Sequence, residues 1–127
     1  MEHARIVIIE DREPNRVLLE KFAEFSGHTV VERAATLPQA LDTLDSLAQR
    51  IANGEIDPPH VYALDGNLEP GRTDCHDARQ IYSKMRELGL PGKIVGYGAN
   101  PLRDHGIPTD HESRKDAGSV IDYIDTL

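Results

Sequence analysis

The sequence predicts a single α/β domain, over residues 1–127, with a doubly wound sheet of five parallel strands in the order 2-1-3-4-5. Short apolar runs alternate with longer segments whose apolar residues recur at helical spacing, which is the pattern of strands joined by crossover helices. Two of the runs, Arg5–Ile9 and Val61–Leu64, are mostly apolar and lead directly into acidic residues. Strands buried on both faces have this composition, and open α/β sheets place ligand sites at the carboxyl ends of their strands.

Local signals place the boundaries of the elements. Pro14 and Gly27 bracket the first helix, because proline suits a first helical turn and glycine a helix end. Thr36 and Gln39 form a capping box at the start of the second helix. Together with the apolar periodicities, these signals predict strands at Arg5–Ile9, Thr29–Val31, Val61–Leu64, Ile94–Val95 and Ile107–Thr109, and helices over residues 14–25, 37–51, 78–88 and 117–124.

The segment between the last two predicted strands, from Ala99 to Gly106, is polar and has no apolar stripe. Asn100-Pro101 and Gly106 leave too few residues for a stable helix. We therefore expect at most one helical turn here, and a reduced or missing fourth helix. Pro108 has no N–H to donate to a sheet, so the weak strand Ile107–Thr109 is expected at a sheet edge.

The charge balance limits the class of partner. Fourteen basic against 22 acidic side chains give a formal net charge of −8. Phosphate backbones bind basic faces, so this balance argues against direct binding to nucleic acid. The single cysteine, Cys75, excludes an internal disulfide framework and fits a cytoplasmic setting. No apolar run approaches the length of a membrane span, so we expect no membrane partner.

Glu10, Asp11 and Asp65 follow the first and third predicted strands. In the order 2-1-3-4-5 these strands are neighbours and the chain reverses direction between them, so the three carboxylates should meet at one crevice. Close carboxylates repel one another unless a cation or protons intervene, and oxygen ligands with room for water favour Mg²⁺. An aspartate beside Mg²⁺ can accept a phosphoryl group. The alternative is a solvated acidic rim without a bound ion.

These residues give the chain a resemblance to the receiver domains of two-component response regulators, which have the flavodoxin-like fold. The matching motifs are the acidic pair Glu10-Asp11, Asp65 at the end of the third strand, and the loop Asp65–Gly71, in which an apolar residue and a proline follow the aspartate. The resemblance implies that Asp65 is the phosphoacceptor. It also implies that Mg²⁺ is held by Asp65, by Asp11 directly, by Glu10 mostly through water, and by the backbone carbonyl of Asn67. The implied partners are a histidine kinase or phosphotransfer protein and a separate output protein.

The switch positions depart from the pattern of that family. Gly98 stands at the end of the fourth strand, where receivers have Thr or Ser, and it either permits a tight strand end or leaves room for a ligand. Asp110 stands where receivers have a lysine after the fifth strand, and Ile107 takes the place of an aromatic residue. Arg114 or Lys115 could supply the missing cation, although ordinary solvated helix charge is the more common role of such residues.

The sequence therefore favours a phosphorelay signalling domain with an atypical switch, which is not itself an enzyme. The alternative is a pseudo-receiver, a protein-interaction module that does not depend on phosphorylation, and Gly98 and Asp110 favour it. A small Mg²⁺-dependent phosphohydrolase with Asp65 as nucleophile is less well supported, because Asn67 stands where a general acid would be needed.

Overall fold

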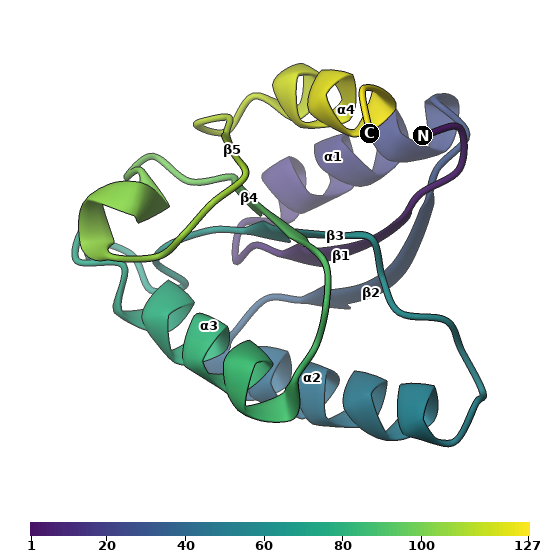
Figure 1. The fold of residues 1–127 in the computed structure, drawn as a ribbon. Coiled ribbons are helices and arrows are strands. Elements are labelled where there is room, and N and C mark those ends of the chain that lie inside the picture. The colour runs from purple at the N-terminus through teal and green to yellow at the C-terminus, as the bar shows by residue number, and fades with distance from the viewer.

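A parallel sheet runs through the centre of the computed structural model, which describes residues 1–127 (Figure 1). The strand order is β2-β1-β3-β4-β5, so the predicted fold class and strand order are confirmed. The strands are β1 (Arg5–Ile9), β2 (Thr29–Ala34), β3 (Val61–Leu64), β4 (Lys93–Gly96) and β5 (His111–Glu112); the helices are α1 (Glu13–Phe25), α2 (Leu37–Ala52), α3 (His76–Leu88) and α4 (Ala117–Asp125), with a 3-10 turn, η1 (Leu102–His105).

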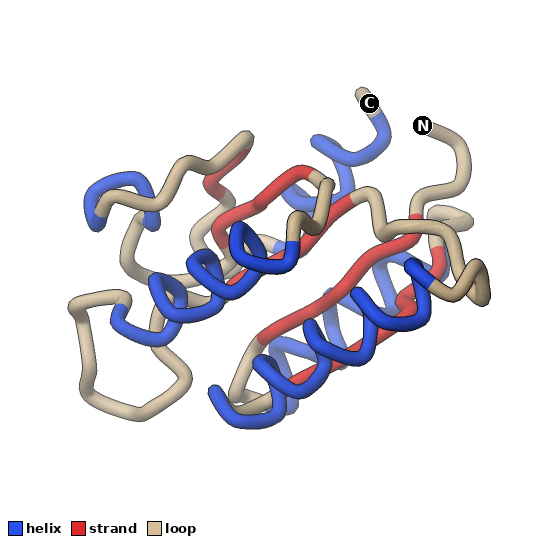
Figure 2. The backbone as a smooth tube through the Cα atoms, turned by 60° about the horizontal axis from the view of Figure 1, so that its bottom comes forward, coloured by secondary structure: helices blue, strands red, loops and turns tan.

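Two helical layers cover the sheet, with α1 and α4 on one face and α2 and α3 on the other (Figure 1). Figure 2 brings the layer of α2 and α3 toward the viewer. Successive residues of a strand point to opposite faces, and accordingly Ile6 and Ile8 pack in the core under α1 and α4, whereas Val7 and Ile9 pack in the core under α2 and α3. The central strands are buried on both faces, which explains their continuous apolar runs.

The connection from β4 to β5 contains the single helical turn that the sequence predicts, η1. The predicted strand Ile107–Thr109 is wrong, because β5 lies at His111–Glu112, where it pairs with Val95 and Gly96 of β4. Ile107 instead closes η1 with its N–H and is only 1% exposed, packed in the core under α2 and α3. Its apolar side chain therefore serves core packing from a loop. None of the helices combines the length and the apolar composition that a membrane span requires.

Candidate functional site

Glu10, Asp11 and Asp65 meet at the carboxyl ends of β1 and β3. The two strands pair in parallel with Ile9 opposite Leu64, so the residues that follow them emerge at the same edge of the sheet. One carboxylate oxygen from each of the three acids lies within 4.8 Å of the others. Glu10 is fully buried and Asp65 is 6% exposed, whereas Asp11 is partly exposed. The structure thus brings together the three acids that the strand order predicts to be close.

Lys115 supplies a positive charge to this cluster. Its Nζ donates to both carboxylate oxygens of Glu10 at 2.7 Å and to Asp65 Oδ2 at 3.0 Å. No other basic side chain is ion-paired with either acid. The more common role, a solvated helix charge, is therefore not the one that Lys115 has. Glu10 follows β1 and Asp65 follows β3, so the contacts of Lys115 connect the carboxyl ends of both strands to the turn after β5.

An unusual turn brings Lys115 to the acids. Arg114 and Lys115 have φ angles of 45° and 67°, in the left-handed region that side chains other than glycine seldom adopt. The turn is held at its start by Ser113, whose N–H and hydroxyl both donate to the carbonyl of Gly96 at 2.8 Å. At its end Asp116 caps α4 through the N–H of Ser119 at 3.1 Å. This anchoring on both sides explains how the strained turn persists.

Asp110 does not lie at the acidic cluster, which corrects the expectation that it stands where receivers have a lysine. Its Oδ2 accepts the N–H of Ile94 at 2.9 Å, at the amino end of β4, and its Oδ1 lies 3.9 Å from Lys93 Nζ. The physical reason is the position of β5, which begins only after Asp110. The residues that follow β5 therefore include Lys115, and the charge at this place is positive.

The environment of Asp65 opposes its ionisation. Burial and the negative charge of Glu10 raise the pKa of Asp65 to about 7, against the opposing effects of Lys115 and of the Asn67 N–H. The contacts with Glu10 and Asp65 raise the pKa of Lys115, although burial by itself lowers it. One ammonium therefore serves two buried carboxylates, with a third nearby. Such a cluster favours the uptake of a further cation or a proton.

The loop after Asp65 is fixed to the start of α3. The Asn67 N–H donates to Asp65 Oδ1 at 3.3 Å, and the Asn67 side-chain oxygen accepts the N–H of Cys75 at 2.9 Å. The buried carboxylate of Asp77 accepts the N–H of Leu68 at 2.8 Å. No residue of the chain donates a hydrogen bond to the backbone carbonyl of Asn67. That carbonyl thus keeps its capacity to bind a ligand.

Gly98 lies directly beside Asp65, with almost no space between them. A Cβ at Gly98 would stand 2.7 Å from Asp65 Oδ1 and 3.1 Å from the Gly66 nitrogen. Of the two explanations open for this glycine, the structure favours a tight strand end over room for a ligand, because Asp65 already fills the space. A pocket of about 150 Å³ opens at the acids, and its lining includes Asp11, Arg12, Asp65, Arg72 and Lys115.

Asn15 contributes to the site and was not anticipated. Its Nδ2 donates to Glu10 Oε1 at 3.3 Å, and its carbonyl accepts the hydroxyl of Tyr97 at 3.0 Å. The available signal was its position in the first turn of the helix that follows the acidic pair. Taken together, the site offers carboxylate oxygens to a cation, a buried carboxylate as nucleophile, and an ammonium that can neutralise an anionic group.

No protein-family model and no curated protein matches the chain. Solved structures do. The receiver domain of the putative response regulator NarL from Mycobacterium tuberculosis matches with a TM-score of 0.71 and 19% identity, over 99% of this chain and 96% of that one. The receiver domain of the histidine kinase CKI1 from Arabidopsis thaliana, complexed with Mg²⁺, matches with a TM-score of 0.68 and 16% identity, over 97% of this chain and 90% of that one. At these identities the likeness establishes the fold: this chain has the receiver-domain fold.

Proposed function

We propose that the chain is a phosphorelay signalling domain that accepts a phosphoryl group on Asp65. The observation that carries this proposal is the convergence of Glu10, Asp11 and Asp65 at the switch point of a receiver-type sheet, with Lys115 bonded to two of them. The receiver-domain fold supports it, since ligands of such sheets bind at the carboxyl ends of the strands where the strand order reverses.

The donor set fits Mg²⁺. Hard cations of this size bind through one or two carboxylates and keep several waters, and this site offers Asp11 and Asp65 directly, Glu10 through water, and the Asn67 carbonyl. When bound, the ion supplies positive charge to the carboxylates and to the oxygens of an incoming phosphoryl group. Lys115 lies close enough to Asp65 to add its ammonium to the same oxygens.

The proposed reaction is a transfer between two nucleophiles. An oxygen of the Asp65 carboxylate bonds to phosphorus, and the bond from phosphorus to the donor breaks, with its electron pair leaving on the donor atom. For a histidine kinase or phosphotransfer protein the leaving atom is an imidazole nitrogen. Arg12, in the lining of the pocket, favours the approach of the anionic phosphoryl group, whereas Arg72 in the same lining is paired with Asp74. The product is a modified domain, so the chain acts as a signalling protein and not as an enzyme of its own.

The proposal extends to the setting of the domain. We place the domain in the cytoplasm, with a histidine kinase or phosphotransfer protein as donor and a separate protein as output. Acidic side chains outnumber basic ones by 22 to 14, which opposes direct contact with nucleic acid.

A phosphorylation-independent interaction module is the second candidate, favoured by the end of the sheet at β4 and β5. The Glu112 carboxylate accepts the N–H of Arg103 at 3.1 Å and the hydroxyl of Thr109 at 3.0 Å, and it fills the space where Gly96 has no side chain. This network ties η1 to β5. Gly98 offers no hydroxyl to a phosphoryl group, so the hydrogen bond that a Thr or Ser at this position could donate to the modified aspartate is missing. Modification at Asp65 would then change this region little.

Treatment with Mg²⁺ and acetyl phosphate, followed by intact mass measurement, tests the proposed function. We expect wild type to gain the mass of one phosphoryl group, Asp65→Asn to gain none, and Asp11→Asn to react at least about tenfold more slowly, because a charged ligand of the ion is lost. Chelation should stop the reaction of wild type. Wild type that stays unmodified while its fold is intact would favour the interaction module, and equal labelling of Asp65→Asn would exclude Asp65 as acceptor.

A further inference from the structure

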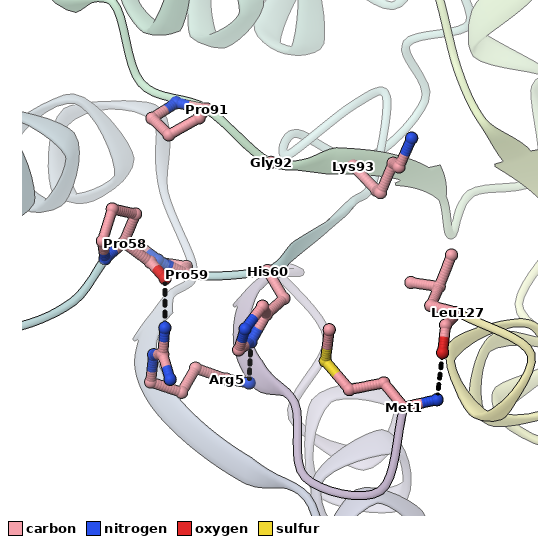
Figure 3. A pocket seen from close by; sticks show the side chains of 9 residues that line it. All are labelled: Met1, Arg5, Pro58, Pro59, His60, Pro91, Gly92, Lys93 and Leu127. Atoms are coloured by element: carbon pink, nitrogen blue, oxygen red, sulfur yellow. Dashed lines mark hydrogen bonds between the residues drawn. The ribbon is translucent and has the colours of Figure 1, made fainter.

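A cavity of about 500 Å³ lies at the end of the sheet opposite the acidic site (Figure 3). Arg5 opens β1, His60 directly precedes β3 and Lys93 opens β4, so the cavity lies at the amino ends of three adjacent strands. Its volume falls in the range of small-molecule sites, roughly 300–1,000 Å³. None of the residues that line it belongs to the proposed phosphoryl site.

The polar side chains that line this cavity are basic, although the chain as a whole is acidic. Arg5 makes one side-chain hydrogen bond, from Nη2 to the carbonyl of Pro58 at 2.9 Å, and its Nε is buried without a partner. His60 Nδ1 accepts the backbone N–H of Arg5 at 2.9 Å, so the neutral ring carries its proton on Nε2. Lys93 Nζ lies 3.9 Å from Asp110 Oδ1, which is too far for a hydrogen bond. The His60 Nε2–H and the Lys93 ammonium thus keep capacity to donate, whereas the Arg5 Nε is enclosed by protein atoms.

The remaining wall is apolar and rigid. Pro58, Pro59 and Pro91 present rings that carry no N–H and restrict the backbone. Gly92 has a φ of 139°, and a Cβ there would stand 2.8 Å from the Tyr62 ring, so this part of the wall is already close-packed. A wall of this kind is ordered before a ligand arrives, which lowers the entropy cost of binding. Met1 and Leu127, which are hydrogen-bonded to each other, complete the rim (Figure 3).

We propose that this cavity binds a small organic carboxylate whose body is flat and apolar. The carboxylate would lie toward Arg5, His60 and Lys93, and the flat body against the proline rings. A single negative charge is favoured over a polyphosphate, because the net charge of −8 repels an anion more strongly as its own charge grows. The apolar wall adds the area that a small ligand needs for measurable affinity.

Amide NMR titrations of the full chain with naphthoate test the proposal. We expect saturable shifts concentrated at residues 58–60 and 91–93, while neutral naphthalenemethanol binds at least about tenfold more weakly, since a charge-assisted contact is worth that much. Lys93→Gln should weaken naphthoate binding by about tenfold for the same reason. The matched control is Lys84→Gln, which removes a lysine paired with Asp45 on another face and should leave binding unchanged.

The variant Asp110→Asn is expected to bind naphthoate with higher affinity than wild type. Asp110→Asn removes the carboxylate nearest to Lys93 but keeps an oxygen that can accept the Ile94 N–H, so naphthoate should bind more tightly than to wild type. Equal binding of naphthalenemethanol, shifts spread away from the cavity, or no response to Lys93→Gln in a folded variant would each overturn the proposal. Tighter binding of naphthyl phosphate than of naphthoate would overturn the assignment to a carboxylate.

Discussion

Replacing Lys115 with glutamine is expected to lower the free energy of unfolding by about 2–4 kcal/mol in metal-free buffer near pH 8. Removing one partner of a buried ion pair leaves an uncompensated charge, and here it leaves two, because the same ammonium bonds to Glu10 and Asp65. The value lies below the usual range for full burial because the Lys115 side chain is 26% exposed. Thermal unfolding would show a melting temperature lower by roughly 10 °C.

The loss of unfolding free energy in Lys115→Gln should depend on pH and on Mg²⁺. A carboxyl whose folded pKa is raised, as that of Asp65 is to about 7, stabilises the fold below its unfolded pKa and loses this contribution as the pH rises through the folded value. Loss of the ammonium raises that pKa further, so the variant should lose less near pH 5, where Asp65 takes up a proton. Added Mg²⁺ should stabilise the variant more than wild type, since no internal cation competes with the ion.

The matched control adds Glu10→Gln to the Lys115 variant. Neutralising the fully buried Glu10 removes one of the two unpaired charges and its repulsion of Asp65, so the double variant should regain at least half of the lost stability. A change below about 0.5 kcal/mol in Lys115→Gln would place the ion pair among ordinary surface pairs and contradict the role that its contacts indicate.

Replacing Gly98 with serine is expected to destabilise the domain by about 1–3 kcal/mol and to slow the labelling of Asp65. Serine is a residue type usual in receivers at this position, but its Cβ would stand 2.7 Å from Asp65 Oδ1 and 3.1 Å from the backbone nitrogen of Gly66. The carboxylate would have to move, and it is held by Lys115 and by the Asn67 N–H. Thermal unfolding and the rate of labelling by acetyl phosphate measure the two effects.

The variant Gly98→Ala distinguishes the steric effect of a Cβ at position 98 from the effect of the serine hydroxyl. Alanine has the same Cβ without a donor, so both variants should lose stability and reactivity to a similar extent. If the serine variant were labelled faster than both wild type and the alanine variant, the site would have room for a hydroxyl. The close packing of Gly98 against Asp65 would then not limit the reaction.

Sequence patterns predicted the sheet because they record burial directly. Apolar runs marked β1 and β3, and the acids that follow these strands lie together as the strand order requires. Thr36 caps α2 by accepting the Gln39 N–H as predicted, while the Gln39 side chain accepts the N–H of Ala35, one residue before the position of a capping box. These features depend on residues that are close in sequence or on the order of strands. Local sequence patterns, together with the strand order that they imply, therefore account for the fold and for the acidic half of the site.

The basic half of the site could not be predicted in the same way. β5 contains only two residues, both polar, and its apolar neighbour Ile107 packs in the core from a loop. The contact of Lys115 with Glu10 joins residues 105 positions apart and depends on two successive left-handed residues that no local pattern indicates. Asp110 was assigned to the wrong place because the predicted strand began too early. Tertiary packing outweighed local propensity at this point.

Amide NMR of the domain with Mg²⁺ and beryllofluoride, a stand-in for the phosphoryl group, tests the central claim most directly. We expect large shifts at residues 10–12, 65–68 and 113–116, because the acids and Lys115 contact the added group. Small shifts are expected through η1 and at Thr109, which the Glu112 network holds in place. Asp65→Asn should abolish the response. Unchanged spectra at residues 65–68 in wild type would contradict the proposed acceptor site, and equally large shifts through η1 would contradict a fixed β4–β5 end.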